Sequence, residues 1–331
     1  MSTFSFKNRR VLVTGAAGFI PSHLTERLVE CGASVRALVR YSSSGSRGWL
    51  EHSPLRSEIE FIHGDLRDAG SVDLAVEGCD TVFHLGALIG IPYSYDAPDS
   101  YVQTNVVGTL NVLKASMRHS IRRLINTSTS EVYGTAKYAP IDENHPLQGQ
   151  SPYSATKIGA DKLTESFHLS FGLDAVVARP FNTFGPRQSA RAVIPAIISQ
   201  MVAGKKSIRL GSLEPRRDLN FVANTVDAFV AIAGADGIAG ETIHFGSGRE
   251  VSIGVLFEMI RQLTGSDAEV ETDANRVRPE RSEVGLLLAD NSKANELLGW
   301  SPKVGLEDGL AATITWIREN TGTYRIDEYA V

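Results

Sequence analysis

The side chains best suited to chemistry in this sequence are a tyrosine and a lysine four residues apart, Tyr153 and Lys157. On a helix this spacing places both side chains on one face, one turn apart. A lysine ammonium near a phenol favours the phenolate, so the tyrosine could act as a base near neutral pH. Such a base suits the removal of a proton from a sugar hydroxyl while a hydride leaves the same carbon. The spacing alone is weak evidence, because it recurs by chance in many helices.

A run of hydroxyl residues and one carboxylate precedes that pair. Residues 126–134 read Asn-Thr-Ser-Thr-Ser-Glu-Val-Tyr-Gly and continue an apolar strand pattern that begins at Arg123. A hydroxyl such as Thr129 could hydrogen-bond the same substrate oxygen as Tyr153. The two segments together therefore predict an oxidation site at the end of a strand.

A dinucleotide-binding pattern at the N-terminus is the first element that must position this site. An apolar strand over 10–14 runs into Gly-Ala-Ala-Gly-Phe-Ile-Pro at 15–21, a helix to Gly32 and a second strand over 35–39. This order predicts a βαβ unit with a pyrophosphate at the helix N-terminus. Pro21 stands where the fingerprint usually has its last glycine. A first-turn proline is tolerated because its N–H would be unpaired anyway, although the local geometry is expected to differ slightly.

The end of the second strand decides the kind of cofactor. An acidic residue there would hold the ribose 2′-hydroxyl of NAD. The run at 40–44 is Arg-Tyr-Ser-Ser-Ser and contains no carboxylate. Arg40 and the serines could hold the 2′-phosphate of NADP, or Arg40 could merely stack near the adenine. The sequence therefore leaves NAD and NADP both open.

Strand and helix patterns alternate through the next part of the chain. Strands are expected over 59–66, 81–87, 123–126 and 175–179, with a helix opened by Asn105 and another over 153–171. This alternation predicts an α/β fold with a doubly wound parallel (Rossmann) sheet. We interpret His84, at a strand end, as structural. The residues assigned to the cofactor are Gly15, Ala17, Gly18, Phe19, Ile20, Arg40, Asp65, Leu66, Leu85, Ala87, Asn105, Tyr153 and Lys157.

The composition changes after residue 180, where glycine, proline and arginine become frequent and the elements look shorter. We therefore expect a dinucleotide-binding domain over 1–180, with a return segment near 219–240. A smaller mixed α/β lobe over 181–331 would mainly bind the substrate. Its expected elements are a strand over 216–222 and helices over 225–234, 252–264, 291–298 and 306–319.

Length and charge exclude several classes of protein. At 331 residues the chain can bury a full core. A net charge of -5 gives no footprint for nucleic acid or an anionic membrane. No apolar run is long enough for a transmembrane helix. Cys31 and Cys79 are the only cysteines and the start is not signal-like, which favours a reducing, cytoplasmic setting. We assign no metal.

Taken in order, the motifs resemble an extended short-chain dehydrogenase/reductase of the NAD-dependent epimerase/dehydratase family. They are T-G-x-x-G-F-I, G-D-L, H-L-G-A, S-T-S-E-V-Y-G, Y-S-A-T-K, R-P-F-N-T-F-G-P-R and R-D-L-N-F-V, and they span nearly the whole chain. The subgroup acts on nucleotide-diphosphate sugars. The resemblance implies a tightly bound NAD or NADP that is regenerated in each cycle.

Within this family, the triplet at 129–131 resembles the GDP-mannose 4,6-dehydratases. The dTDP-glucose 4,6-dehydratases have Asp-Glu where this chain has Ser130-Glu131, and the epimerases usually have a small or apolar residue in place of Glu131. The triplet is also similar to that of a UDP-glucuronate decarboxylase. The runs over 188–195 and 276–284 look most similar to the 4,6-dehydratases of the legionaminic-acid pathway, which act on nucleotide-linked N-acetylglucosamine.

The resemblance implies a lyase that makes a 4-keto-6-deoxy sugar from a UDP- or GDP-linked N-acetylglucosamine. Tyr153 would take the C4 hydroxyl proton and Glu131 the C5 proton. Ser130 would relay a proton to the leaving hydroxyl, or Glu131 would act as both base and acid. The catalytic residues are Thr129, Ser130, Glu131, Tyr153 and Lys157. For the substrate diphosphate, Arg217 and Arg278 match phosphate-binding positions and Asn182 matches a hydrogen-bonding one. Arg187 and Arg191 are further candidates, with a surface role equally open for both.

Three rival functions remain open. A nucleotide-sugar 4-epimerase would use Tyr153 and Lys157 but would not need Glu131. An oxidative decarboxylase would need a cation aimed at a C5 carboxylate. A non-catalytic nucleotide-binding protein is disfavoured by the intact Thr129, Tyr153 and Lys157.

The resemblance also implies a homodimer. In relatives, the equivalents of helices 105–119 and 153–171 form an intersubunit four-helix bundle. The apolar residues on these helices are Leu110, Leu113, Leu163 and Phe167, and they could equally pack inward.

Overall fold

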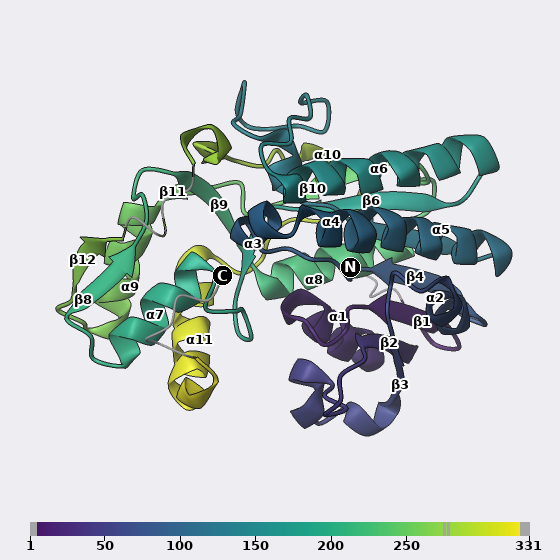
Figure 1. Cartoon of the computed structure of the whole chain (residues 1–331), viewed down its shortest axis with the longest axis horizontal. Coiled ribbons are helices and arrows are strands. Elements are labelled where there is room, and N and C mark those ends of the chain that lie inside the picture. Colours follow the sequence, from purple (N-terminus) through teal and green to yellow (C-terminus); the bar gives the residue numbers. More distant parts are fainter. Residues whose placement is uncertain (1–4, 274–275, 277–278, 325–331) are drawn as a thin grey trace.

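The structure, a computed structural model, describes residues 5–273, 276 and 279–324. At its centre lies a parallel sheet in the order β10-β6-β5-β4-β1-β2-β3. This confirms the predicted doubly wound α/β fold (Figure 1). The strands are β1 (Arg10–Thr14), β2 (Ser34–Arg40), β3 (Ile59–Gly64), β4 (Thr81–His84), β5 (Arg123–Thr127), β6 (Ala175–Pro180) and β10 (Thr242–Phe245).

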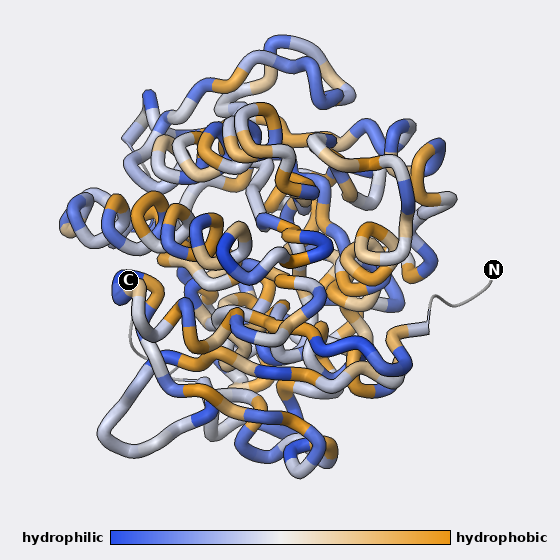
Figure 2. The backbone as a smooth tube through the Cα atoms, turned by 90° about the vertical axis from the view of Figure 1, so that its right-hand side faces the viewer, coloured by the Kyte–Doolittle hydropathy of each residue, from blue (hydrophilic) through white to orange (hydrophobic). Residues whose placement is uncertain are grey.

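Helices cover both faces of this sheet. On one face α1 (Phe19–Glu30) packs with α8 (Val222–Gly234). On the other face α5 (Gly108–Arg118) packs with both α2 (Ala69–Val76) and α6 (Pro152–Phe171). The hydrophobic segments therefore concentrate in the interior, as Figure 2 shows.

Strand β1 shows why its sequence is apolar at successive positions. Val11 and Val13 lie in the core that also holds Leu24 of α1. Leu12, between them, lies in a separate core with Val112 of α5. Side chains alternate between the two faces of a strand, so a parallel strand covered on both sides needs apolar residues at every position.

The helix expected to open at Asn105 begins earlier. A continuous helical run consists of α4 (Pro98–Tyr101), a π-helical segment over Val102–Val107 and then α5. Asn105 therefore lies inside a widened turn, a feature that often marks functional sites. The expected strands over 59–66 and 81–87 are also shorter and end at Gly64 and His84.

The second lobe has its own apolar core, which includes Ile197, Leu219, Leu256 and Leu310. Strand β9 pairs with β11, β13 and β7, and β8 pairs with β12. The elements are β7 (Asn182–Phe184), α7 (Val193–Val202), β8 (Ser207–Leu210), β9 (Arg216–Phe221), β11 (Glu250–Ser252), α9 (Ile253–Thr264), β12 (Glu269–Thr272), β13 (Leu286–Leu287) and α11 (Leu306–Glu319).

The chain returns to the first sheet after β9. Helix α8 packs on α1, and β10 then pairs with β6. Helix α10 (Ser292–Leu298) packs against β10. The return segment expected near 219–240 thus extends through Phe245 to the edge of the sheet.

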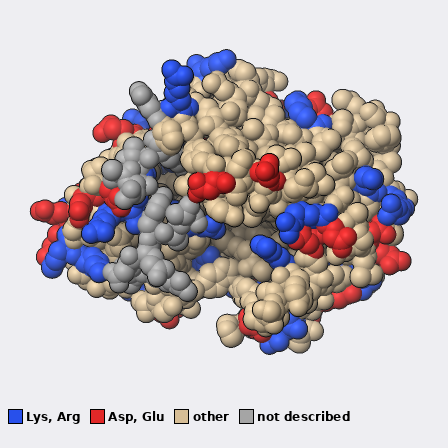
Figure 3. Space-filling view, viewed as in Figure 1, with Lys and Arg blue, Asp and Glu red and all other residues tan. Residues whose placement is uncertain are grey.

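The two lobes contact one another away from the sheet. Trp49, in a short 3-10 helix over Gly48–His52, meets Trp316 of α11 edge to face, with ring centroids 5.4 Å apart. On the face seen in Figure 3, charges of both signs interleave and the surface is hollowed between the lobes. Within the described residues, no helix has the length and apolarity needed to cross a membrane.

Candidate active site

Helix α6 fixes Tyr153 in its first turn. The Ser151 hydroxyl accepts the Ser154 amide at 3.1 Å, and the Ser154 hydroxyl accepts the Ser151 amide at 3.0 Å. This capping box satisfies first-turn amides and sets where the helix begins. Gly172 ends the helix in a left-handed conformation with φ of +71°.

Tyr153 and Lys157 are both buried, with 7% and 5% of their surfaces exposed. Lys157 Nζ donates to the Thr127 carbonyl at 2.5 Å rather than to the phenol. Burial raises the pKa of Tyr153, and the hydrogen bond with Thr129 offsets only part of that rise. Burial lowers the pKa of Lys157, while the charge of Asp161 opposes this. The expected effect of Lys157 on the phenol is therefore not a direct contact, and the phenol is held in its neutral form.

Residues 129–131 follow β5 and open a short 3-10 helix over Ser130–Tyr133. Thr129 caps it, and its hydroxyl accepts the Glu131 amide at 3.3 Å. Ser130 is 2% exposed and Glu131 is 9% exposed. Glu131 acts on the Tyr153 phenol as a neighbouring charge and contributes to the raised pKa of that phenol. Among the described residues, no hydrogen-bond or ion-pair partner contacts the Glu131 carboxylate.

An aromatic wall closes one side of Tyr153. The Tyr101 ring meets the Tyr153 ring edge to face at 6.3 Å, and the Tyr101 hydroxyl donates to the Gly90 carbonyl. Gly90 precedes α3 (Ile91–Asp96). A Cβ on Gly90 would lie 3.2 Å from Nη1 of Arg191, so this arginine reaches the same wall. Tyr101 has no predicted role and Arg191 is predicted only as a candidate ligand of the substrate diphosphate; no local spacing predicts that the two meet here.

Asn105 ties the loop after β4 to α6. Its side-chain oxygen accepts the Leu88 amide at 2.8 Å, and its Nδ2 donates to the Leu88 carbonyl at 3.0 Å and to Thr156 Oγ1 at 3.1 Å. Asn105 is 1% exposed. This contact holds the loop that carries Leu85 and Ala87 beside the catalytic helix.

His84 is locked as a neutral side chain. The Thr14 hydroxyl accepts the amides of Leu85 and Gly86, so its single proton goes to His84 Nδ1 at 2.8 Å. His84 Nε2 therefore carries the ring proton and donates to Thr109 Oγ1 at 3.0 Å. Burial lowers the pKa of His84 to about 3. This geometry agrees with the structural role that the sequence favoured.

A buried ion pair stands behind the site, one turn beyond Lys157. Asp161 and Arg179 lie 2.8 Å apart, each with 4% of its side chain exposed. Ser128 donates to Asp161 at 2.5 Å, and Arg179 also donates to the Tyr133 hydroxyl. Sequence reasoning missed this network, because its members are spread over four elements and match no motif.

The first βα turn provides a cradle that fits a dinucleotide. Gly15 has φ of +69°, and a Cβ there would lie 2.7 Å from the Gly86 backbone, so only glycine fits. Phe19 and Ile20 begin α1, and their amides have no intrahelical partner. Pro21 occupies the third helical position and is buried, as expected for a tolerated proline.

Other predicted cofactor residues lie at the same edge of the sheet. Arg40 ends β2 and pairs in register with Gly64 at the end of β3. The Asp65 carboxylate is held by Arg67 through two hydrogen bonds of 2.9 and 2.6 Å. That hydrogen bonding is the main reason why the pKa of Asp65 is lowered. Leu66 packs against the loop after β4, where a Cβ on Gly86 would lie 2.8 Å from it.

The other predicted substrate residues differ in their surroundings. Within the described part of the chain, the buried Oδ1 of Asn182 has no hydrogen-bond partner. Arg217 is 7% exposed and its Nη2 lies 3.0 Å from Glu283. Arg187 pairs with Glu26 of α1 at 2.9 Å, so its charge is already neutralised. Arg278 lies outside the described residues. The structure therefore brings Asn182 forward as a group with unused hydrogen-bonding capacity.

The fold and this site together define an extended short-chain dehydrogenase/reductase. A family model described as GDP-mannose 4,6 dehydratase matches residues 12–313. The chain belongs to this family of NAD-dependent nucleotide-sugar dehydratases and epimerases, and it is an enzyme of that family.

The relatives of this chain include both dehydratases and epimerases. The chain is 32% identical to a dTDP-glucose 4,6-dehydratase of Actinoplanes sp., over 94% of this chain and 98% of that protein. It is 34% identical to a UDP-glucose 4-epimerase of Mycolicibacterium smegmatis, over 94% and 99%. The structure of DesIV, a dTDP-glucose 4,6-dehydratase from Streptomyces venezuelae with NAD bound, superposes with a TM-score of 0.87 at 29% identity, covering 96% and 99% of the two chains.

Proposed function

We propose that this enzyme is a nucleotide-diphosphate-sugar 4,6-dehydratase that makes a 4-keto-6-deoxy sugar, with a UDP- or GDP-linked N-acetylglucosamine as substrate. The observation that carries the proposal is the Glu131 carboxylate. It is nine-tenths buried, acts on the Tyr153 phenol and has no partner among the described residues. Burying a carboxylate without a partner is costly, so such a group is retained where it has a task.

The residues of the first βα turn fit NAD or NADP. Gly15 lets the backbone approach closely, and the amides of Phe19 and Ile20, at the start of α1, would hold a pyrophosphate. Arg40, at the end of β2, lies on the ribose side. A dinucleotide bound there would supply a reversible hydride acceptor for C4 and C6 and would be regenerated in each cycle.

Tyr153 takes the proton of the C4 hydroxyl during the oxidation. Because burial raises the pKa of Tyr153, the phenolate needs positive charge nearby when it forms. Lys157 supplies one such charge from the next turn of α6. Thr129 already hydrogen-bonds the phenol and can share the same substrate oxygen.

Glu131 takes the C5 proton, which the new C4 ketone has made acidic. The C5–H electron pair forms the C5–C6 double bond, and the C6 hydroxyl leaves. Glu131 returns its proton to that hydroxyl, either directly or through Ser130, so that one water is released. When the hydride adds to C6, C5 takes up a second proton, which balances the one that Tyr153 removed from the C4 hydroxyl. A carboxylic acid is a competent proton donor here, whereas the hydroxyl of Ser130 can only relay a proton.

Polar groups of the second lobe would bind the diphosphate. Asn182 would bind a phosphate oxygen through its Nδ2 group, which donates. Its buried Oδ1, which has no partner among the described residues, can only accept and would not contact a phosphate. Arg217 and Arg278 remain the predicted phosphate ligands. Arg187 would have to leave Glu26 to contact the substrate, so its predicted role is the weakest of the four.

Two rivals share the first oxidation. A 4-epimerase is favoured by the identity to the Mycolicibacterium enzyme and needs no base at C5. A uronic-acid decarboxylase needs a cation near C5, and Arg191 lies on the aromatic wall that contacts Tyr153. Mass spectrometry of products from a panel of UDP-, GDP- and dTDP-sugars separates these reactions: loss of water, no change in mass or loss of carbon dioxide.

The decisive variant is Glu131→Gln. It should still oxidise C4, because Tyr153, Lys157 and Thr129 are unchanged, but elimination should slow about 10²–10⁴-fold for loss of a general base. Reduced cofactor and a 4-keto sugar should then accumulate on the enzyme, visible in the absorbance of the dihydronicotinamide.

The matched control is Glu143→Gln. Glu143 is also a shielded carboxylate, but it accepts the His244 amide at 2.8 Å, and a glutamine oxygen can do the same. This control should release dehydrated sugar at nearly the wild-type rate. If Glu131→Gln does so too, the dehydratase assignment is wrong.

The same proposal includes a homodimer in a cytoplasmic setting. Both cysteines are free thiols. Of the side chains expected at the dimer face, Leu113 is fully buried inside its own domain, whereas Leu163 and Phe167 are only partly buried. Light scattering at micromolar concentration tests the assembly, and a monomer there would exclude it.

A further inference from the structure

The segment after β2 forms a roof over the first βα turn. The Trp49 amide donates to the Ala17 carbonyl at 3.3 Å. A Cβ on Gly48 would lie 2.4 Å from that same carbonyl oxygen, so the roof touches the turn directly. A pocket of about 520 Å³ lies beneath, lined by Ala17, Arg40, Tyr41, Ser42, Ser43, Ser46 and Gly48.

The lining of this pocket contains a cation and several hydroxyls but no carboxylate. Glu51 is the first acid after β2, and it accepts the Arg47 amide at 3.2 Å and pairs with Arg56 at 3.5 Å. Asp65, the acid at the end of the neighbouring strand, is held by Arg67. No acid is therefore available to accept a ribose 2′-hydroxyl in this pocket.

The guanidinium of Arg40 is available to bind a ligand. Arg40 is exposed, and among the described residues it makes no hydrogen bond or ion pair, although its charge acts weakly on Asp65. A guanidinium presents a planar fork of donors that matches the oxygens of a phosphate.

The serines of the roof are oriented to donate. Ser42 Oγ accepts the Ser46 amide at 3.1 Å, and Ser46 Oγ accepts the Gly48 amide at 3.1 Å. A hydroxyl whose oxygen already accepts a backbone N–H keeps its own proton for another acceptor, as Ser46 does. The Ser42 hydroxyl also lies 3.2 Å from the Ser44 hydroxyl, and either of these two can donate to the other, which leaves one proton of the pair for a ligand. Ser43 is exposed and lines the same pocket. These hydroxyls and Arg40 make a set of donors suited to an anion.

We propose that this pocket binds the 2′-phosphate of an adenosine dinucleotide, so that the enzyme uses NADP in preference to NAD. The inference rests on the dinucleotide site of the proposed function, but not on the sugar reaction. It would separate this enzyme from DesIV, whose structure holds NAD.

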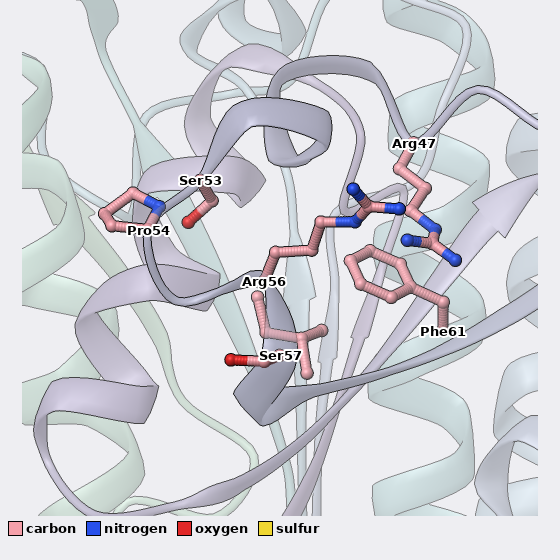
Figure 4. A pocket seen from close by; sticks show the side chains of 7 residues that line it. Arg47, Ser53, Pro54, Arg56, Ser57 and Phe61 are labelled. Atoms are coloured by element: carbon pink, nitrogen blue, oxygen red, sulfur yellow. The ribbon is translucent and has the colours of Figure 1, made fainter.

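A second pocket on the other side of the same segment provides the control. It has a volume of about 600 Å³ and is lined by Arg47, Ser53, Pro54, Arg56, Ser57, Ile59 and Phe61 (Figure 4). Its arginines are engaged: Arg47 lies 4.5 Å over the Phe61 ring, and Arg56 pairs with Glu51. Removing Arg47 therefore tests charge on the same segment without touching the proposed phosphate pocket.

The first experiment identifies the nucleotide that the purified enzyme carries, by denaturing it and analysing the released nucleotide by mass spectrometry. NADP is expected, and a majority of NAD overturns the proposal. Enzyme freed of nucleotide is then titrated calorimetrically with adenosine 2′,5′-bisphosphate and with AMP, in the absence of any sugar. The bisphosphate should bind at least about tenfold more tightly, with a preference that falls as salt rises.

Two variants test whether Arg40 causes the tighter binding of the bisphosphate. Arg40→Ala should reduce the ratio of the two affinities by roughly 10–100-fold, the loss of one charge-assisted hydrogen-bonding group, and leave the affinity for AMP nearly unchanged. Arg47→Ala should leave the ratio unchanged. Equal affinities in the wild type, or a ratio lost in Arg47→Ala but kept in Arg40→Ala, would overturn the assignment. Because no sugar is present, this result does not depend on whether the enzyme is a dehydratase or an epimerase.

Discussion

Two regions of the molecule, which meet α6 one helical turn apart, differ in how many partners their buried charged groups have. Around Tyr153 and Lys157 the described ionisable groups have few partners: the ammonium donates to one carbonyl, and the Glu131 carboxylate has none. Around Asp161 and Arg179 each charge is paired, and hydroxyls occupy further hydrogen-bonding positions.

The difference separates a reacting site from its support. A buried ion pair that is fully hydrogen-bonded holds one arrangement and has nothing left to offer a ligand. Buried groups with open capacity are costly to the fold but can bind and transfer protons. The same helix therefore carries the proposed chemistry on its first two turns and Asp161 of the rigid support on its third.

The largest effect is expected from exchanging one phenol for a phenyl ring in each region. Tyr153→Phe should lower turnover about 10²–10⁴-fold and keep nucleotide binding, because it removes the base. Tyr133→Phe should keep turnover but lower the free energy of unfolding by about 1–3 kcal/mol, because Arg179 and His244 lose a buried partner. Steady-state kinetics and urea unfolding measure both. Near-normal turnover in Tyr153→Phe would remove the distinction between the regions.

The second prediction breaks the support directly. Asp161→Ala leaves the Arg179 charge buried and unpaired, so the free energy of unfolding should fall by about 3–5 kcal/mol. The double variant Asp161→Leu with Arg179→Met removes both charges and should recover most of that loss. Urea unfolding at neutral pH measures each variant. A single variant as stable as the wild type would mean that the pair does not support the site.

A third, smaller effect concerns acid. The pKa of His84 is about 3 in the folded chain, below its ordinary 6.5. Between these two pKa values, His84 binds a proton in the unfolded chain but not in the folded chain. Stability is intact above pH 6.5 and falls as the pH drops below it, by about 1.4 kcal/mol per pH unit for this one group.

His84→Gln should remove the contribution of His84 to the slope of the free energy of unfolding against pH. Urea unfolding between pH 6.5 and 5 measures this slope. The exposed His63 of β3 supplies the control, and His63→Gln should keep the wild-type slope. His244, also buried with a lowered pKa, should preserve a residual slope in both variants. An unchanged slope in His84→Gln would contradict the neutral assignment.

The smallest effect is expected for an exposed ion pair on α6, which serves as the reference for the buried pair. Lys162 and Glu165 pair at 2.6 Å on its exposed face. Replacing either with Gln should change the free energy of unfolding by no more than about 0.5 kcal/mol, because water and salt screen the pair. A loss as large as that from Asp161→Ala would show that exposure does not explain the contrast.

Local patterns predicted most of the sheet and placed the candidate pair Tyr153 and Lys157 on one helix. Apolar runs such as 10–14 and 175–179 could be recognised as strands because they are buried on both faces. Tyr153 and Lys157 could be recognised because their spacing acts within one helix. The capped start of that helix at Ser151 fixed their position.

Features that join distant parts of the chain were beyond those patterns. The partner of Arg187 is Glu26, far away in the sequence, so no spacing could show that this cation is engaged. The π-helical segment around Asn105 also matches no pattern that the sequence analysis used. The network of Asp161 and Arg179 likewise depends on which strands become neighbours.

The position of β10 has a consequence for how the protein is made. Thr242–Phe245 pairs with β6, which ends at Pro180, so synthesis must proceed well past the second lobe's first elements before the sheet is complete. Until then β6 presents an unpaired edge of backbone N–H and C=O groups, which is a template for pairing with another nascent chain. A fragment ending at residue 180 would keep that edge permanently. The unit that can safely leave the ribosome and fold is therefore longer than the part that binds the dinucleotide.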